Sequence, residues 1–259
     1  MPHADLLRAL RSAQHVFILT GAGTSAESNL PTFRDPGPHR GLWDNHRPED
    51  LASPDAFAAH PARVQSWYGH RRRAALAAQP NPAHHAIAQL AQHVPKLTLV
   101  TQNVDGLHQR AGSKGVLELH GSLHRWHCVN TGEPVDDATL DAQLPQTPDD
   151  PPLRSPSGTG YVRPGVVWFG EGLPTDVLAK AEAAARTADV ALSIGTSALV
   201  YPAAALPLLA KEAGAYTAEI NPTPSAIAHQ LDAAITQPAG VAMSELLRTL
   251  TAGINPDGV

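Results

Sequence analysis

A glycine turn directly after a short apolar run is the part of this sequence best suited to binding chemistry. Residues 16–19 are apolar, Gly21-Ala22-Gly23 follows after one threonine, and small residues continue through Ala26. This is the order of a strand, a tight turn and the start of a helix. Glycines let the backbone approach a phosphate, and the N–H groups at a helix start can donate to it. The pattern fits G-x-G-x-x-G/A and indicates a site for the pyrophosphate of a dinucleotide.

The segment after this turn differs from that of an ordinary dehydrogenase. In a dehydrogenase the next strand comes soon and ends in an acidic ribose ligand roughly 20 residues on. Here residues 31–35, PTFRD, open a long polar stretch with several prolines, and the next strand-like run is 97–101. We therefore expect an insertion beside the dinucleotide site.

Polar side chains also follow the next two predicted strands. Asn103 and Asp105 come after residues 97–101 and could hold a carboxamide or a ribose, or simply cap the following helix. His120 stands at a strand end before Gly121, where an imidazole can act as a general base near neutral pH. The chain has 14 histidines, so any one of them could equally be a surface or core residue.

Two later strand ends carry small polar residues of the same character. Gly195-Thr196-Ser197 ends one apolar run, and Asn221 ends another. Hydroxyl and amide groups at these positions suit hydrogen bonds to ribose or phosphate. Each signal is weak alone, but polar groups at the carboxyl ends of several parallel strands would converge on one cleft.

The apolar runs predict the frame that positions these residues. Strands are predicted at residues 15–20, 97–101, 116–119, 166–169, 190–195, 216–220 and 233–236. Helices are predicted at residues 5–13, 63–78, 83–92, 104–111, 175–188, 201–213 and 242–250. Strands that alternate with helices predict an α/β fold with a doubly wound, parallel, Rossmann-like sheet.

Two insertions are predicted to form a smaller lobe beside this sheet. Residues 1–35, 79–122 and 164–259 are assigned to the Rossmann-like, dinucleotide-binding domain. A helical insertion spans 36–78, and a polar, proline-rich insertion spans 123–163. The second insertion is poor in core residues and is expected to pack loosely.

Composition limits the function classes further. The 42% hydrophobic and 17% charged content is typical of a globular chain rather than a disordered one. A net charge of −5 without a dense basic face gives no reason to expect nucleic-acid binding. The single cysteine excludes an internal disulfide framework and fits a reducing compartment. No leader-like or membrane-spanning apolar stretch stands out, so we expect a soluble, cytoplasmic protein with no membrane partner.

Six motifs in a fixed order resemble one family. The segments GAGTSAESNLPTFRD, TQNVDGLH, HG, RPGVVWFGE, IGTS and EIN are similar to those of the sirtuins, the NAD-dependent protein-lysine deacylases. The resemblance covers about residues 14–240. It implies a Rossmann-like NAD-binding fold, NAD as co-substrate and acylated-lysine proteins as partners. It also implies the products nicotinamide, free lysine and O-acyl-ADP-ribose, with no hydride transfer.

The resemblance assigns roles to residues of the matching motifs. It implies that His120 and Asn103 are catalytic, with His120 as the general base. The residues implied to bind NAD are Gly21, Ala22, Gly23, Phe33, Arg34, Gln102, Asn103, Val104, Asp105, Gly195, Thr196, Ser197, Asn221 and Ala239. The residues that resemble the loop pairing with an extended peptide are Val167, Phe169, Gly170 and Glu171.

A tyrosine and an arginine in the first insertion bear on the acyl group. Tyr68 and Arg71 are three residues apart in a predicted helix and therefore share one face. A guanidinium can bind a carboxylate with two hydrogen bonds, and a phenol can add one more. The pair resembles that of the sirtuin subclass that removes succinyl and malonyl groups. The alternative is that Arg71 begins a solvated basic run with Arg72 and Arg73 and that Tyr68 merely packs.

The zinc site of most sirtuins is incomplete in this sequence. Such a site needs two cysteine pairs in tetrahedral geometry. Cys128 is present, but Thr131 stands where its partner is expected, and residues 155–158, SPSG, carry no thiol. The second insertion is therefore a degenerate zinc lobe, and we predict no zinc.

Three other functions compete with a lysine deacylase. A mono-ADP-ribosyltransferase or NAD hydrolase would share the NAD residues but need no acyl-lysine channel. A non-catalytic NAD or ADP-ribose sensor would not need His120. A hydride-transferring dehydrogenase is least favoured, because its acidic ribose ligand is missing at the required spacing.

Overall fold

A six-stranded parallel sheet forms the centre of the larger part of the molecule. The computed structural model describes residues 4–32 and 47–252. The strands lie in the order β3-β2-β1-β7-β8-β9. Their bounds are β1 His15–Thr20, β2 Lys96–Thr101, β3 Leu117–Glu118, β7 Val190–Ile194, β8 Tyr216–Ile220 and β9 Ala233–Ile235. The chain runs from β1 outward to β3 on one side and then from β7 outward on the other, so the topology reverses beside β1. A ligand crevice is expected at this reversal, outside the carboxyl ends of the strands.

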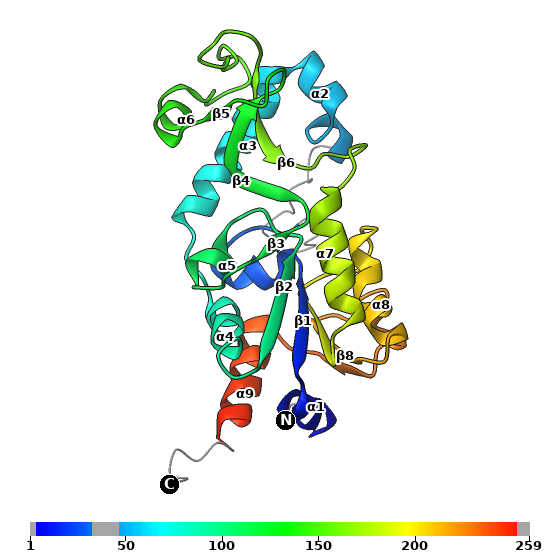
Figure 1. The fold of residues 1–259 in the computed structure, drawn as a ribbon. Coiled ribbons are helices and arrows are strands. Elements are labelled where there is room, and N and C mark those ends of the chain that lie inside the picture. The colour runs from blue at the N-terminus through cyan, green and yellow to red at the C-terminus, as the bar shows by residue number, and fades with distance from the viewer. Residues whose placement is uncertain (1–3, 33–46, 253–259) are drawn as a thin grey trace.

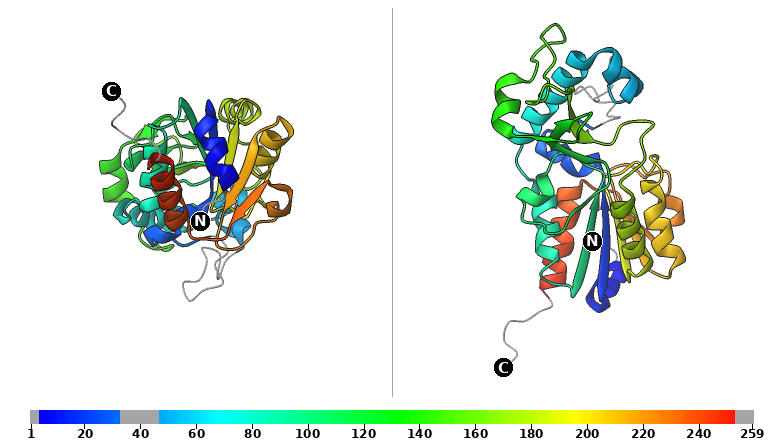
Figure 2. Two further views of the ribbon diagram at one scale, coloured as in Figure 1. Left: turned by 90° about the horizontal axis from the view of Figure 1, so that it is seen from below. Right: turned by 45° about the horizontal axis from the view of Figure 1, so that its top comes forward.

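Helices cover both faces of this sheet and confirm the predicted doubly wound α/β fold. Figures 1 and 2 show α4 and α9 on one side of the strands and α7 and α8 on the other. The bounds are α1 Ala4–Ser12, α4 Pro82–Leu90, α7 Thr175–Arg186, α8 Leu206–Glu212 and α9 Ala239–Thr251. Strand β1 is buried throughout. Val16 and Ile18 pack in the core beneath α1, α4 and α9, whereas Phe17 and Leu19 pack beneath α7 and α8. A nearly continuous apolar run is what a parallel strand covered on both faces requires.

A smaller lobe with its own antiparallel sheet lies above the strand ends (Figure 1). Its strands are β4 Gly121–Cys128, β5 Pro134–Val135 and β6 Val162–Val166, in the order β5-β4-β6. Its helices are α2 Pro54–Ala59, α3 Pro61–Ala77 and α6 Asp137–Gln143. Its core joins α2 and α3 to the second insertion, with Phe57, Val64, Trp126 and Trp168 all buried. This apolar cluster holds the lobe together, so the lobe is not loosely packed as its polar sequence suggested. The exact domain boundaries stay a prediction.

The expected strand at residues 166–169 is placed differently in the structure. The strand there is β6, which ends at Val166 and pairs antiparallel with β4 in the smaller sheet. Val166 and Trp168 bury their side chains in the smaller lobe's core. The apolar run therefore has the composition of a buried strand, but its partner is β4 and not the parallel sheet.

Two helices begin later than their apolar patterns predict. Helix α5 spans only Leu107–Arg110, because Gly106 has a φ of 72° and Asp105 accepts the Leu107 N–H at 2.9 Å, which caps the helix. Residues 201–213 split into the 3₁₀ turn η3, Ala203–Ala205, and α8, which has a proline in its first turn. The remaining 3₁₀ segments are η1 Ala22–Ser28, η2 Pro48–Asp50 and η4 Ala228–Gln230. Across the described ranges no helix is long and apolar enough to cross a membrane.

Candidate functional site

The glycine turn after β1 lies against the end of β7. The Gly21 N–H donates to the Ile194 carbonyl at 3.0 Å, and the Gly23 N–H donates to the Gly195 carbonyl at 2.8 Å. A Cβ added at Gly21 would lie 2.7 Å from the Thr196 Cβ, and one at Gly23 would lie 2.8 Å from the Gly195 oxygen. Only glycine fits this contact, and the small residues keep the start of η1 uncovered by side chains. The geometry is that of a cradle for a dinucleotide phosphate.

The segment after β2 is fixed to this turn by its amide and carboxyl groups. The Asn103 side chain donates to the Gly21 carbonyl at 3.0 Å and to the Ser25 hydroxyl at 3.1 Å. The Ser25 hydroxyl donates to Asp105 at 2.8 Å. Burial raises the pKa of Asp105, although the hydrogen bonds from Leu107 and Ser25 oppose the shift. Asp105 therefore does cap α5, as one alternative held, and it also belongs to a buried polar network at the strand ends.

Gln102 links both halves of the sheet to His120. Its side chain donates to the Thr196 hydroxyl at 3.0 Å, across the topological reversal. Its backbone carbonyl lies 3.0 Å from Nδ1 of His120. If Nδ1 carries the proton and donates it there, Nε2 of the neutral ring keeps a lone pair. Burial lowers the pKa of His120, and the Gln102 carbonyl opposes this shift. A half-buried imidazole that is neutral at pH 7, with one nitrogen oriented by a carbonyl, is suited to take up a proton.

The end of β8 joins the same edge of the sheet. The Asn221 side chain donates to the Thr196 carbonyl at 3.2 Å, and the Ser197 carbonyl accepts the Ala226 N–H at 3.3 Å. Ser197 is exposed, whereas Thr196 is buried. Ala239 is buried at the start of α9, where the next amide, Gly240 N–H, donates to Glu27 of η1 at 2.6 Å. The structure thus brings the strand ends after β1, β2, β7 and β8 together around one crevice.

A cavity connects this edge of the sheet to helix α3. It has a volume of about 280 Å³ and is lined by residues of both parts. From the sheet side come Ala22, Ser25, Gln102, Asn103, Val104 and Asp105, and from α3 come Trp67, His70, Arg71, Ala74 and Ala75. The helical insertion therefore contributes one wall of the cavity and the strand-end residues contribute the other.

Arg71 lies inside this cavity and Tyr68 lies behind it. The Arg71 guanidinium carbon lies 4.6 Å from the centroid of the Trp67 ring and 5.3 Å from that of Tyr68. Burial lowers the pKa of Arg71, and the proximity of Tyr68 and Asp105 opposes the shift. Burial also raises the pKa of Tyr68, which is 2% exposed, so the phenol stays protonated and can donate. Arg71 is partly exposed, whereas the neighbouring Arg72 is buried, so these arginines do not form one uniformly solvated run.

The segment 167–171 lies between the two lobes. The Val167 N–H donates to the His120 carbonyl at 2.9 Å, and the Phe169 N–H donates to the Ala52 carbonyl at 2.8 Å. The Phe169 side chain is 49% exposed. Within the described residues, the Gly170 N–H has no hydrogen-bond partner. Val167, Phe169, Gly170 and Glu171 thus form an accessible backbone segment with an exposed ring, as a peptide-pairing loop would need.

Not every expected residue can be placed, and several residues that line the cavity were not expected, Ser25 and Trp67 among them. Phe33 and Arg34 lie outside the described residues. Ser25, which connects Asn103 to Asp105, was missed, although it stands among the small residues after the glycine turn. Trp67 was also missed as a cavity residue. Its position four residues before Arg71 on one helix face is the signal that could have found it.

Comparisons with known proteins agree with this geometry. Residues 21–202 match the Sir2 family. This chain belongs to the Sir2 family. A protein of Pseudomonas aeruginosa called NAD-dependent protein deacylase 1 is 49% identical over 245 residues, covering 94% of this chain and 97% of that protein.

Solved structures of Sir2 homologues share the whole fold. One in complex with NAD is 40% identical and aligns with a TM-score of 0.86 over 98% of this chain and 96% of its own. A point mutant of a Sir2 homologue in complex with ADP-ribose is 42% identical and has a TM-score of 0.87 over 97% of this chain and 98% of its own. These matches span both lobes.

The zinc lobe of this Sir2 chain contains hydroxyl groups where cysteines would be expected. Cys128 is buried, and its sulfur lies 3.6 Å from the Thr159 hydroxyl. Ser155, Ser157 and Thr159 bond to one another through their hydroxyls at 2.9–3.4 Å. Hydroxyl groups and one thiol do not make the four-ligand set that zinc requires. Among the residues that the structure describes, no group of three or more His, Cys, Asp or Glu side chains could hold a metal ion.

Replacing Gly195 with alanine is expected to disrupt the cradle. Gly195 has a φ of 62°, and an added Cβ would overlap the backbone nitrogen of Thr24. The left-handed conformation and the overlap together should lower the free energy of unfolding by at least about 2 kcal/mol. The melting temperature should fall by roughly 4–8 °C, and the added stabilisation by NAD should disappear. Thermal unfolding with and without NAD measures both effects.

Gly172→Ala is the matched control for this variant. Gly172 is exposed, and a Cβ there would meet no atom within 4 Å. This control should melt close to the unmodified protein. A Gly195→Ala variant that melts normally and is still stabilised by NAD would show that the close contact between η1 and β7 is not needed.

Proposed function

We propose that this protein removes acyl groups from lysine side chains of proteins, with NAD as the co-substrate, and that it prefers succinyl and malonyl groups. The observation that supports this proposal most is the cavity that joins Arg71 of α3 to Gln102, Asn103 and Asp105. An acyl-lysine that enters from the α3 side would place its acyl oxygen next to the strand-end residues. The deacylase name of the P. aeruginosa relative supports the same reaction class.

The glycine cradle and the strand ends fit NAD. Gly21 and Gly23 let the turn before η1 pack directly against Gly195 and Thr196, with no side chain between them. Thr196, Ser197 and Asn221 offer hydroxyl and amide groups for the adenosine half. Asn103 uses its amide nitrogen to bond to the glycine turn and to Ser25, so its carbonyl oxygen is available to a ligand in the cavity. NAD supplies the electrophilic ribose carbon that accepts the acyl oxygen when nicotinamide leaves.

His120 is assigned the proton-transfer step. With Nδ1 donating to the Gln102 carbonyl, Nε2 can accept the proton of a ribose hydroxyl. The lowered pKa of His120 keeps this nitrogen unprotonated at neutral pH. One water molecule would be consumed when the C–N bond to lysine breaks, and the products would be free lysine, nicotinamide and O-acyl-ADP-ribose. Cytoplasmic location is also part of this proposal, based on the single, unpaired cysteine.

Arg71 is proposed to bind the carboxylate of an acidic acyl group. The guanidinium lines the cavity and lies beside the Tyr68 ring. A carboxylate that reaches it gains charge-assisted hydrogen bonds in a site shielded from water. An acetyl group would leave the same arginine without that partner, which weakens acetyl-lysine binding.

Replacing Arg71 with methionine is expected to reverse the acyl preference. For one peptide carrying succinyl- or malonyl-lysine, kcat/KM should fall by about 10- to 100-fold, since a hydrogen bond to a charged group contributes roughly 1.5–3 kcal/mol. For the acetylated peptide, kcat/KM should stay equal or rise. Steady-state turnover of the three peptides with NAD measures the change.

Arg73→Met controls for the loss of a positive charge on α3. Arg73 donates to His70 at 2.7 Å and does not line the cavity. It should leave the order of acyl preference unchanged. Faster acetyl turnover in the unmodified protein, unaffected by Arg71→Met, would make it a deacetylase. Consumption of NAD without turnover of any peptide would favour a mono-ADP-ribosyltransferase or NAD hydrolase.

A further inference from the structure

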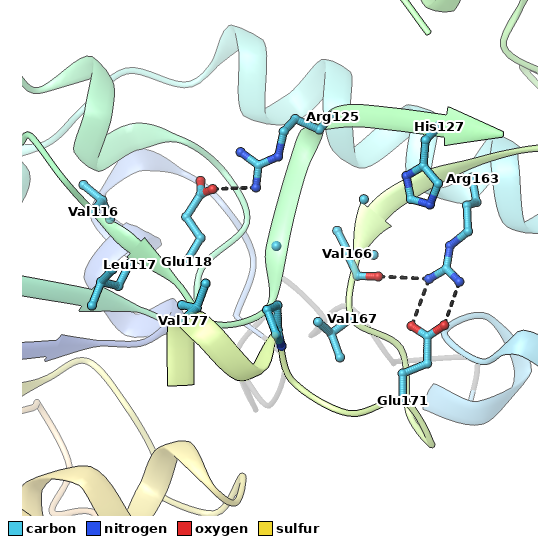
Figure 3. Close-up of a pocket in the computed structure, with 13 residues that line it drawn as sticks. Val116, Leu117, Glu118, Arg125, His127, Arg163, Val166, Val167, Glu171 and Val177 are labelled. Carbon is cyan, nitrogen blue, oxygen red and sulfur yellow. Dashed lines mark hydrogen bonds and ion pairs between the residues drawn. The ribbon is translucent and has the colours of Figure 1, made fainter. Parts of the chain in front are cut away.

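Arg163, within β6, contacts the segment 167–171 in three ways. Its guanidinium binds the Glu171 carboxylate with two hydrogen bonds of 2.6 and 2.9 Å, as the dashed lines in Figure 3 show. The same group donates to the Val166 carbonyl at 3.1 Å. It also lies 3.5 Å from the centroid of the Trp168 ring. One side chain thus contacts Val166, just before the segment, and Trp168 and Glu171 within it.

Glu171, at the end of the segment, binds both the Arg163 side chain and the backbone of the segment. Its carboxylate accepts the Trp168 N–H at 2.8 Å in addition to the two bonds from Arg163. Burial opposes ionisation, but the hydrogen bonds from Arg163 and Trp168 keep the pKa of Glu171 below its usual value. Both carboxylate oxygens of Glu171 accept hydrogen bonds within the protein. Glu171 therefore stabilises the segment and does not present a free carboxylate to a substrate.

The Trp168 ring lies between Arg163 and the core of the smaller lobe. Its centroid is 5.2 Å from that of Phe57 and 6.3 Å from that of Tyr68. The backbone on either side is bonded to His120 by Val167 and to Ala52 by Phe169. A change in Arg163 would therefore alter a segment that touches both the base residue and the small lobe.

A cavity lies on the other side of this segment. It has a volume of about 440 Å³, and Arg163, Glu171 and Val167 are among its lining residues (Figure 3). The Arg163–Glu171 ion pair therefore forms part of the wall of this cavity. A second pair, Arg125–Glu118, lines the same cavity, but the Arg125 side chain is 63% exposed, against 12% for Arg163. Solvent screens the exposed pair much more strongly.

We propose that Arg163 and Glu171 are positioning residues that hold segment 167–171 in the conformation to which the backbone of the substrate protein pairs. The proposal rests on the proposed deacylase function. The pair acts through Phe169 and Gly170 and does not touch the acyl group. It therefore sets the affinity for the peptide around the acyl-lysine, and leaves NAD binding and the chemical steps largely unchanged.

Arg163→Lys and Glu171→Gln test the proposal, with Arg125→Lys as the matched control. Lysine keeps the charge of Arg163 but cannot form the two parallel bonds. For an acylated peptide of about ten residues, KM should rise about tenfold in both variants, with kcat and the KM for NAD unchanged within about twofold. A single capped acyl-lysine, which has no flanking backbone, should keep its KM. The double variant should be no worse than either single one, because both changes break the same interaction.

Two further readouts separate this proposal from the proposed function. Hydrogen exchange at the Trp168 amide should be at least about tenfold faster in both variants than in Arg125→Lys. Binding of a fluorescent acyl-peptide should weaken in parallel, whether or not it is turned over. If the unmodified protein turns over no acyl-peptide, the proposed function fails, and these two readouts still decide the positioning role.

Three results would overturn the positioning role. One is an unchanged peptide KM together with unchanged exchange at Trp168. Another is an equal rise in KM for the peptide and for the capped acyl-lysine. The third is a fall in kcat alone, which would place the pair in the chemical steps. Thermal unfolding of each variant confirms that it is folded before these comparisons are made.

Discussion

Replacing His120 with alanine is expected to reduce deacylation by roughly 10²- to 10⁴-fold, the usual contribution of a positioned general base. The Nδ1 atom lies 3.0 Å from the Gln102 carbonyl, and this contact orients the ring so that Nε2 can take a proton. Alanine removes the proton acceptor but leaves the glycine cradle and the Asn103–Ser25–Asp105 network unchanged. The loss should therefore appear in kcat and not in the affinity for NAD.

The step that releases nicotinamide should survive this substitution. It precedes the proton transfer assigned to His120, so His120→Ala should still exchange labelled nicotinamide into NAD when an acyl-peptide is present. Steady-state deacylation and nicotinamide exchange, measured on the same preparation, separate the two steps. His93→Ala, which removes an exposed imidazole, is the control and should behave like the unmodified protein.

The pH profile gives an independent check on His120. Because burial lowers its pKa, the acidic limb of kcat/KM should lie below the ordinary histidine value of about 6.5. Equal loss of deacylation and of nicotinamide exchange in His120→Ala would assign His120 to nicotinamide release or to NAD binding instead.

The second large effect expected is a loss of about 4 kcal/mol in the free energy of unfolding when the pH falls from about 7.5 to about 5. Two buried histidines, His84 of α4 and His108 of α5, cause it, and their ring centroids are 4.7 Å apart. Burial lowers the pKa of His84 to about 4 and that of His108 to about 3. Repulsion from His85 adds to the lowering of the His84 pKa, and repulsion from His84 adds to that of His108.

The hydrogen bonds explain why both rings stay neutral in the folded protein. Nδ1 of His84 accepts the Asn81 N–H at 3.2 Å, so a proton on that nitrogen would face another donor. Nε2 of His108 bonds to Thr20 at 2.9 Å, whereas Nδ1 of His108 is buried and has no partner among the residues that the structure describes. A proton on this second nitrogen would have no acceptor, which is costly in a buried site.

The sign of the pH effect follows from these lowered pKa values. The unfolded chain binds the protons near pH 6.5, while the folded protein resists them down to about pH 4 and pH 3. Stability is therefore complete above about pH 6.5 and falls as the pH drops below it, by about 2 kcal/mol for each histidine at pH 5. Urea unfolding at several pH values measures this loss.

His108→Leu identifies the source of the effect. This variant should lose about 2 kcal/mol less than the unmodified protein between about pH 7.5 and pH 5, whatever its stability at neutral pH. His93→Gln, at an exposed position, should leave the pH dependence unchanged. If His108→Leu showed the same pH dependence of stability as the unmodified protein, other groups would be responsible for the loss of stability at acidic pH.

The local pattern was sufficient to predict the parallel sheet and most of its polar strand ends. In β1, Val16 to Leu19 are apolar on both faces, and a glycine turn follows, so the strand and the turn at its end could be predicted without tertiary information. The same holds for Asn103, His120 and Asn221, which stand directly after apolar runs. These features depend on neighbours in the chain, and the carboxyl ends of parallel strands necessarily meet at one edge.

The apolar pattern alone could not predict which strand residues 166–169 would pair with. Residues 166–169 have the composition of a core strand, but Val166 pairs with Gly121 of β4 because the second insertion brings that strand alongside. The packing of Trp126, Val135 and Leu140 into one cluster with α3 depends equally on contacts between distant segments.

The sequence by itself determined the α/β fold, the family resemblance and the residue types at the strand ends, because each follows from residue order and spacing. Only the tertiary structure decided that Arg71 shares a cavity with Asn103 and Asp105, which are more than 30 residues away in the chain. It likewise decided that Glu171 is engaged by Arg163 and that His84 and His108 are buried side by side. Charge and burial at these positions come from groups on separate segments that meet only when the chain folds, and the local apolar pattern does not encode that meeting.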